Sequence, residues 1–327
     1  MHYYLLLQFP YLTVIPSFYL HLFPYPKIMI PNQPEDLLTL LKSIVPDHRK
    51  PVSLLRQDFS AFINEMEDQE AESLTIEPVE ITPELKGHWV STPEAVTDQI
   101  ILFFHGGDFS FGSTQDYLEM CRRIARAAQS RVFSVDYRLA PEHIFPAAVE
   151  DAITAYKYLL SRGYLSHLIV PAGISAGGTL VIDLLVSARD EGLPLPHAGV
   201  CMSPVADMLF KGESVTKNIG NDWLTPEGLN AIRTLYLAGH NPEDPCASPV
   251  YAHLYGLPRL YIQAGTHELL LSDIAAFVDK ARWAGVPVRF ELWEGMVHSW
   301  QAFARRIPEG ERAIDLVGAY IQDAMVR

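Results

Sequence analysis

A serine in a glycine-rich turn is the first residue that could do chemistry. Ser175 lies in GISAGG (173–178), which follows an apolar run at 168–170 and precedes a helix-forming stretch at 179–188. This strand–turn–helix order is the context of a nucleophile elbow, a tight turn that exposes a reactive serine. The helix that follows favours negative charge at its N-terminus. We predict that Ser175 is a nucleophile; the alternative is a glycine-rich loop with an incidental serine.

A second glycine-rich turn, HGGDF (105–109), follows the apolar run 100–104. Consecutive glycines let backbone N–H groups converge on one point, as an oxyanion hole requires. The predicted donors are the N–H groups of Gly106, Gly107 and Ala176. His105 is very close to this turn, so we expect it to support the loop by hydrogen bonds rather than to act as a base. The alternative is an ordinary glycine turn after a strand.

The base should be a histidine late in the chain, because folds with this type of elbow order their triad serine, acid, histidine. Of the 12 histidines, His298 follows the last predicted strand, 288–293, in a loop. The acid should follow the preceding strand, 259–264. Two carboxylates compete there, Glu268 in the loop and Asp273 in the first turn of the next helix. Glu268 is preferred, since a carboxylate in a first helical turn is common for electrostatic reasons alone.

Composition excludes several classes of protein. The chain has 327 residues, of which 49% are apolar and 20% are charged, so it can bury a large core and is not intrinsically disordered. The net charge of −14 disfavours binding to nucleic acid or to an anionic membrane surface. Its three cysteines are sparse and form neither a disulfide framework nor a zinc motif, which favours a reducing, cytoplasmic compartment.

The elements that must position these residues alternate between strands and helices. Short apolar runs predict strands at 100–104, 131–135, 168–172, 199–202, 259–264 and 288–293. Helical patterns between and after them lie at 117–128, 147–160, 176–189, 274–284 and 313–324. A further strand-like section covers 74–90. This alternation predicts an α/β fold with a mostly parallel central sheet that helices cover on both faces.

Two parts of the chain depart from this alternation. Residues 1–31 are apolar and rich in proline, which argues against a membrane helix or a signal peptide and favours an irregular arm or an extended start. The stretch 208–240 is too long for an ordinary connection and contains a helix signal at Thr225 and Pro226, so we expect a lid element. We predict an arm at 1–31, a helical cap from 32–70 plus 208–240, and a catalytic domain from 71–207 plus 241–327. The cap would contain helices at 34–46 and 54–66.

The motifs HGGDFSFGS (105–113), DYRLAPEHIFPAA (136–148), GISAGG (173–178), SPVAD (203–207) and GMVH (295–298) occur in this order. Together they resemble the hormone-sensitive-lipase-like family of α/β-hydrolases, most closely its bacterial carboxylesterases, over about residues 75–325. The resemblance implies a serine triad and an HGG oxyanion hole beneath a cap, with Ser175 as nucleophile, Glu268 as acid and His298 as base. The family's acid pattern, Gly-x-x-Asp/Glu-x-Leu, matches 265–270 and favours Glu268 over Asp273.

Two positions depart from the family pattern. Ile174 precedes the serine where relatives commonly have Asp or Thr, and Asp108 stands where many members have a third glycine. The second departure raises the question of how the site would accept an anionic substrate. The candidate substrate-pocket residues are Asp108, Phe109, Ile174, Trp223 and Leu224.

These observations predict a serine carboxylesterase that hydrolyses short-chain acyl esters through an acyl-enzyme, without a metal or cofactor. Its partner would be a small-molecule ester, and the sequence leaves a homodimer open. An amidase, lactonase or transacylase would use the same triad. A membrane-associated lipase that uses residues 1–31 is a further alternative, and a catalytically dead receptor is disfavoured because the three candidate triad residues are all present.

Overall fold

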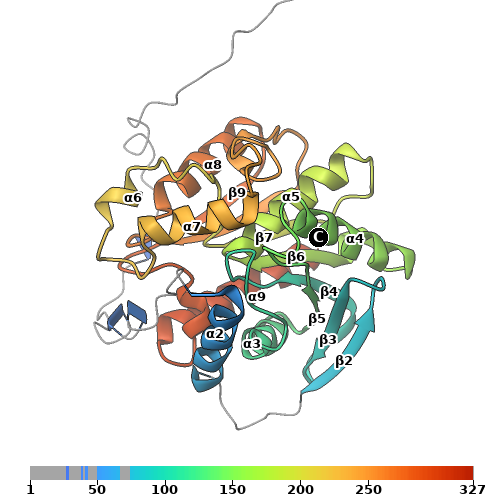
Figure 1. Cartoon of the computed structure of the whole chain (residues 1–327). Coiled ribbons are helices and arrows are strands. Elements are labelled where there is room, and N and C mark those ends of the chain that lie inside the picture. Colours follow the sequence, from blue (N-terminus) through green and yellow to red (C-terminus); the bar gives the residue numbers. More distant parts are fainter. Residues whose placement is uncertain (1–26, 29–37, 40, 43–49, 67–73, 327) are drawn as a thin grey trace, which may run out of the picture.

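The apolar runs of the sequence assemble into one twisted sheet with helices on both faces (Figure 1). The computed structural model describes residues 27–28, 38–39, 41–42, 50–66 and 74–326. Within these residues the sheet has nine strands in the order β1-β9-β8-β7-β6-β4-β5-β3-β2. The strands are β1 (Lys27–Ile28), β2 (Thr75–Glu80), β3 (Lys86–Ser91), β4 (Val96–Phe104), β5 (Ser130–Asp136), β6 (Ile169–Ile174), β7 (Ala198–Met202), β8 (Arg259–Gly265) and β9 (Val288–Trp293).

Most neighbouring strands are parallel, and β3 pairs antiparallel with both β2 and β5. The prediction of an α/β fold with a mostly parallel sheet is confirmed. The helices are α2 (Val52–Met66), α3 (Leu118–Ala128), α4 (Ala147–Ser161), α5 (Ala176–Asp190), α6 (Ser214–Lys217), α7 (Pro226–Leu237), α8 (Leu271–Trp283) and α9 (Pro308–Val326).

The core follows the two-residue alternation of a strand that is buried on both faces. In β4, Ile101 and Phe103 pack in the cluster that contains α3 and α9. Leu102 and Phe104 point the other way, into the cluster that contains α4, α5 and α8. These four side chains are fully buried, so the sheet provides a rigid base for the loops at its carboxyl edge.

The structure differs from the sequence expectations in several boundaries. The section 74–90 forms two strands, β2 and β3, because the chain reverses at residues 81–85 and pairs with itself. Helix α9 begins at Pro308, earlier than the apolar pattern indicates, since proline is well suited to a first helical turn. The predicted helix 34–46 lies mainly outside the described residues, which are helical at 38–39 and 41–42. The arm at 1–31 also lies outside them, apart from β1.

The inserted segment 208–240 contains α6 and α7, which Figure 1 shows in yellow to one side of the sheet. Helix α7 begins as the sequence indicates: the Thr225 hydroxyl accepts a hydrogen bond from the Gly228 N–H at 3.0 Å, and Pro226 occupies the first helical position. Among the described helices, none combines the length and the apolar character that crossing a membrane requires.

Helix α2 is attached to the turns around the elbow through Arg56. Its guanidinium donates hydrogen bonds to the carbonyl oxygens of Ser110 at 2.8 Å and Ala140 at 3.0 Å. It also forms an ion pair with Glu142 at 2.7 Å. Two of these acceptors are backbone carbonyls, so Arg56 holds the helix against the turns in addition to forming an ion pair. Helix α7 contacts the same turns, because Tyr236 stacks on Phe109 and its carbonyl oxygen accepts a hydrogen bond from the Phe145 N–H at 2.9 Å.

Candidate active site

Ser175 lies in a sharp turn between β6 and α5, with a backbone φ of 54° and ψ of −123°. A side chain at Gly177 could not fit, because a Cβ there would lie 2.0 Å from the carbonyl oxygen of Phe104. The glycine thus lets α5 start directly against the end of β4. As a result, the Ser175 side chain stands at the helix N-terminus, at the carboxyl edge of the sheet.

Three side chains form a hydrogen-bonded series at this edge. Ser175 Oγ lies 2.9 Å from His298 Nε2, and His298 Nδ1 lies 3.0 Å from Glu268 Oε2. Ser175 follows β6, Glu268 follows β8 and His298 follows β9, so three parallel strands deliver their loops to one place. All three residues are buried. With the proton on Nδ1, the imidazole donates to Glu268 and accepts from the serine hydroxyl.

Glu268 is oriented by its other carboxylate oxygen. Oε1 accepts hydrogen bonds from the Gly265 N–H at 2.6 Å and from the Ser203 hydroxyl at 2.8 Å, which leaves Oε2 facing His298. Asp273, the competing carboxylate, is located in the first turn of α8. A Cβ at Gly212 would lie 2.8 Å from Asp273 Oδ1, so this carboxylate packs against the inserted segment. The structure therefore brings Glu268, and not Asp273, to His298.

The turn after β4 lies against the elbow. A Cβ at Gly106 would come within 3.4 Å of the Ser175 Cβ, and Gly107 has a positive φ of 114°. A Cβ at Gly107 would collide with the Phe111 carbonyl oxygen at 2.0 Å, so only glycine fits there. Ala176 is the first residue of α5, and an N–H in a first helical turn has no acceptor within the helix.

His105 is buried behind this turn. Its Nδ1 lies 2.6 Å from the Gly106 carbonyl oxygen, and its own carbonyl oxygen accepts a hydrogen bond from the Tyr137 hydroxyl at 2.9 Å. Its ring stacks on Tyr137 with 4.3 Å between ring centroids and on Tyr117 with 5.8 Å. Burial is the main cause that lowers the pKa of His105 below its usual value. These contacts hold the glycine turn from behind, and they do not involve His298.

The predicted pocket residues occupy different environments. Phe109 stacks on Tyr236 of α7 with 3.9 Å between ring centroids. Ile174 is fully buried in the core layer with α3 and α9, because its register in β6 directs it to that face. The Trp223 indole N–H donates to the His298 carbonyl oxygen at 2.8 Å, and Leu224 is buried in the opposite core layer. A direct contact of Ile174 or Leu224 with substrate stays a prediction.

Asp108 has a positive φ of 57° and is 9% exposed. Burial raises the pKa of its carboxyl group to about 6, an effect that the nearby His298 partly offsets. A negative charge held this close to His298 would repel an anionic acyl group. The sequence-based expectation that Asp108 affects the choice of substrate stays a prediction.

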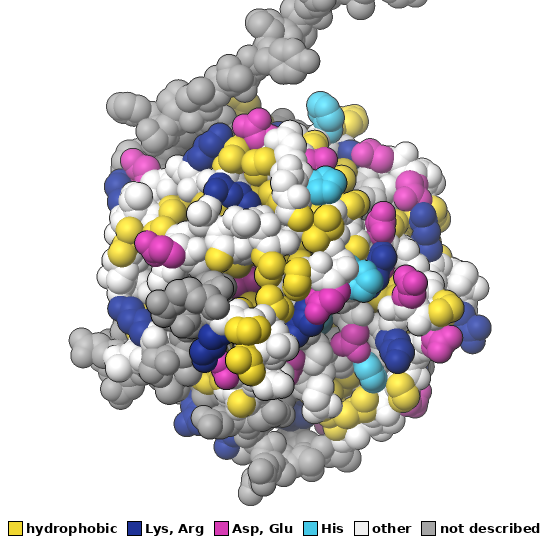
Figure 2. All heavy atoms as spheres, viewed as in Figure 1, with side chains coloured by type: hydrophobic (Ala, Val, Ile, Leu, Met, Phe, Trp, Pro, Cys, Tyr) yellow, Lys and Arg dark blue, Asp and Glu magenta, His cyan; other side chains and the backbone are white. Residues whose placement is uncertain are grey.

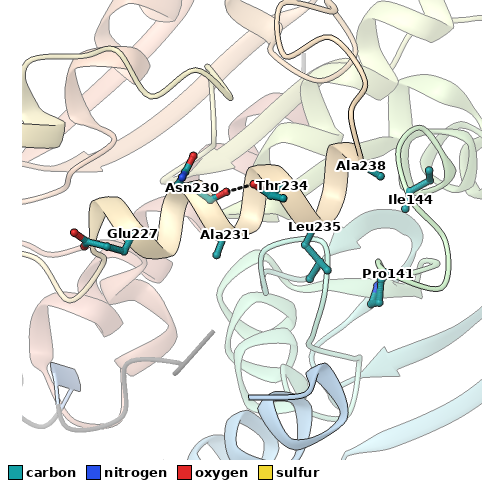
Figure 3. A pocket seen from close by; sticks show the side chains of 8 residues that line it. All are labelled: Pro141, Ile144, Glu227, Asn230, Ala231, Thr234, Leu235 and Ala238. Atoms are coloured by element: carbon teal, nitrogen blue, oxygen red, sulfur yellow. Dashed lines mark hydrogen bonds between the residues drawn. The ribbon is translucent and has the colours of Figure 1, made fainter. Parts of the chain in front are cut away.

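A groove of about 630 Å³ runs along the outer side of α7. Its lining includes Ala231 and Leu235 of the helix and the turn at Pro141 and Ile144 (Figure 3). Figure 2 shows apolar side chains gathered around the middle of this face, with charged side chains of both signs spread around them. Ser175, His298 and Glu268 do not line the groove, so the groove is not the space in which the acyl group of a substrate would lie.

Two residues that contact Glu268 or His298 were not predicted from the sequence. Ser203 follows β7 directly, and besides its bond to Glu268 it accepts a hydrogen bond from the Ser299 N–H at 3.2 Å. Its place at the end of a strand, in SPVAD, was a usable signal. Asp222 belongs to the inserted segment and accepts a hydrogen bond from the His298 N–H at 2.9 Å. Nothing in the residue types around Asp222 indicates this contact.

The charges around His298 act in opposite directions. Burial by itself lowers the pKa of the imidazole. The hydrogen bond and the negative charge of Glu268 raise it, and the charges of Asp222 and Asp108 add to the effect. The net result is a His298 pKa above its usual value. The site therefore favours a positive charge on this imidazole, as would develop if it accepted the serine proton.

Known proteins are similar to this chain in both fold and sequence. A family model described as the alpha/beta hydrolase fold matches residues 101–302. An acetyl-hydrolase of Streptomyces hygroscopicus is 40% identical over 237 residues, which cover 72% of this chain and 79% of that protein. An esterase of Acinetobacter venetianus is 34% identical over 223 residues, 68% of this chain and 74% of the relative.

Solved structures give the same result. The crystal structure of an esterase from the bacterial hormone-sensitive lipase family is 39% identical to this chain. It superposes with a TM-score of 0.84 over 90% of this chain and 100% of its own. Because sequence and structure agree over most of the chain, the protein belongs to the α/β-hydrolase family, within its hormone-sensitive-lipase-like branch of esterases.

Proposed function

We propose that the protein is a serine carboxylesterase that hydrolyses short-chain acyl esters through an acyl-enzyme intermediate. One observation carries the proposal: the buried series in which Ser175 Oγ lies 2.9 Å from His298 Nε2 and His298 Nδ1 lies 3.0 Å from Glu268. The names of the similar proteins support this proposal, because they are an acetyl-hydrolase and esterases. Serine, histidine and carboxylate in this geometry are the groups that acyl transfer requires.

In the proposed mechanism, Ser175 Oγ attacks the ester carbonyl carbon while His298 Nε2 takes its proton. The N–H groups of Gly106, Gly107 and Ala176 would hold the oxyanion. When the tetrahedral intermediate collapses, the C–O bond to the alcohol breaks and His298 returns the proton to the leaving oxygen. A water molecule then attacks the carbonyl carbon of the acyl-enzyme while His298 takes its proton. His298 returns this proton to Ser175 Oγ as the carboxylic acid leaves. Glu268 orients the imidazole and stabilises its positive charge.

We further propose that the N-terminal segment 32–70 and the insertion 208–240 form one cap over the catalytic domain. Leu38, Leu41 and Phe62 pack in the same apolar cluster as Trp223. The Lys42 ammonium donates a hydrogen bond to the carbonyl oxygen of Gly220. These contacts join two segments that are far apart in sequence, next to the loop that contains His298. Among the residues of this proposed cap, we expect Trp223 to limit the length of the acyl group.

A panel of 4-nitrophenyl esters of increasing chain length tests the function. We expect high kcat/KM for acetate and butyrate and a steep decline toward palmitate, because a closed cap leaves no extended apolar surface for a long chain. The matched 4-nitroanilide of butyric acid should be a far poorer substrate. A maximum at palmitate would contradict the short-chain assignment, and preferential cleavage of the anilide would contradict the esterase assignment.

The pH dependence tests the base. His298 must be neutral to accept the serine proton, and its pKa is raised chiefly by Glu268 against the lowering effect of burial. Because the folded pKa lies above the ordinary value of about 6.5, kcat/KM should fall with an acid limb centred above that value. The measurement is kcat/KM from pH 5 to pH 9, with circular dichroism as a check that the protein remains folded. An activity that stays constant through this range would contradict a histidine base.

A further inference from the structure

The inserted segment makes hydrogen bonds to both loops that hold the candidate acid and base. Asp222 Oδ1 accepts from the His298 N–H, and Asp222 Oδ2 accepts from the Leu269 N–H, each at 2.9 Å. Asp222 is 2% exposed, so this carboxylate is buried between the two loops. Leu269 directly follows Glu268 in the chain. A single carboxylate therefore links the acid loop to the base loop.

Two neighbours of Asp222 strengthen this link. The Asn218 amide donates to the carbonyl oxygens of Thr266 at 3.0 Å and Glu268 at 2.8 Å. The Trp223 indole N–H donates to the carbonyl oxygen of His298 at 2.8 Å. The backbone is thus held on both sides of Glu268, and His298 is held by both its N–H and its carbonyl group.

We propose that Asp222, together with Asn218 and Trp223, is a positioning residue of the triad, so that the cap segment 218–223 sets the distance between Glu268 and His298. This inference rests on the esterase function proposed above. Asp222 does not touch the reacting atoms; it acts through the backbone of the two residues that do. The cap would then be required for the chemical step itself as well as for enclosing the acyl group.

The chemistry of the carboxylate explains why an aspartate suits this position. Asp222 uses one oxygen for each loop, and Oδ1 also accepts from the Trp223 N–H at 2.9 Å. An asparagine has one acceptor oxygen, so its NH₂ group would face the N–H of either Leu269 or His298. Two donors in contact repel each other, and one loop would be released. The substitution is nearly isosteric, so packing is otherwise preserved.

The charge of Asp222 supplies a second readout. The charged groups that interact with His298 are Glu268, Asp222 and Asp108, and those that interact with Asp222 are His298 and Glu268. Removing the negative charge of Asp222 makes a positive imidazole less stable. The pKa of His298 then falls, and the acid limb of kcat/KM moves to lower pH. Replacing Trp223 by phenylalanine removes a hydrogen bond to His298 but no charge, so that limb should stay in place.

The test compares Asp222→Asn with Asp207→Asn in the full chain. Asp207 is a matched control, because it is also a buried carboxylate near the insertion, and the hydrogen bonds that it accepts come from the Leu209 N–H at 2.8 Å and the Tyr251 hydroxyl at 3.1 Å rather than from the loops of Glu268 and His298. Asp222→Asn should lower kcat for 4-nitrophenyl butyrate by up to about 100-fold, the scale of a catalytic group displaced by about 1 Å, with little change in KM. Its acid limb should move to lower pH, whereas Asp207→Asn should keep wild-type kcat and acid limb.

An Asp222→Asn variant that matches Asp207→Asn in kcat and in its acid limb would overturn the proposal. If Asp222→Asn does not fold, Asn218→Ala carries the test, since it removes the two bonds on the acid side alone; a wild-type kcat in that variant would also overturn it. Wild-type protein is first checked for ester hydrolysis and for covalent labelling of Ser175 by an organophosphate. A wild type that fails both checks refutes the proposed function rather than the positioning role.

Discussion

Replacing Ser175 by alanine is expected to lower kcat for ester hydrolysis by roughly a million-fold, the loss typical of a serine triad without its nucleophile. The reason is the geometry of the elbow. Ser175 Oγ is the atom that His298 Nε2 contacts, at 2.9 Å, and an alanine leaves nothing for the imidazole to deprotonate. The measurement is kcat for 4-nitrophenyl butyrate, with thermal unfolding recorded on the same preparation.

Ser134→Ala is the matched control for this substitution. Ser134 is also fully buried and hydrogen-bonded, accepting from the Thr114 hydroxyl at 2.9 Å, but it belongs to β5 within the sheet. An organophosphate should label Ser175 in the wild type and in Ser134→Ala, and should leave Ser175→Ala unlabelled. Labelling of a different serine, together with retained activity in Ser175→Ala, would show that the nucleophile lies elsewhere.

Glu268→Gln is expected to lower kcat by about 10⁴-fold, as removal of the charge does in other triads. The hydrogen bonds of Glu268 explain how. Its Oε1 accepts from the Gly265 N–H, so the oxygen of a glutamine should keep that role and direct its NH₂ group toward His298 Nδ1. The imidazole would then keep its proton on Nε2, facing Ser175, and could not accept the serine proton.

Asp273→Asn separates this effect from a general loss of buried charge. Asp273 is also buried, and burial together with the charge of Asp207 raises its pKa to about 7. Because its carboxylate packs against Gly212 rather than His298, kcat should remain close to the wild-type value. Comparing kcat and KM for the two variants decides between the carboxylates. A larger loss in Asp273→Asn than in Glu268→Gln would identify Asp273 as the acid.

Several features could be predicted because they depend on residues close together in the chain. Most of the elbow and the glycine turn follow from steric limits that act within a few residues: a Cβ at Gly173 would lie 2.2 Å from the Gly177 carbonyl oxygen, and a Cβ at Gly107 would lie 2.0 Å from the Phe111 carbonyl oxygen. Gly177 differs, because the atom that excludes its Cβ is the Phe104 carbonyl oxygen at the end of β4, which is distant in the chain. The start of α7 at Thr225 and Pro226 is a local hydrogen bond and a local φ preference. The order of strands and loops predicted that Glu268 and His298 follow the strands whose carboxyl ends meet.

Other features depended on tertiary structure. Residue types alone left Asp273 open as the acid, and the sheet register with the position of α8 brought Glu268 to His298. Asp222 contacts Leu269 and His298, which lie 47 and 76 residues away in the chain. Its partners there are backbone N–H groups, which every residue except proline has, so no pattern of residue types marks them. The contacts of Asp222 with the loops of Glu268 and His298 are therefore a property of the packed chain, whereas the chemistry of the side chains Ser175, Glu268 and His298 is already present in the sequence.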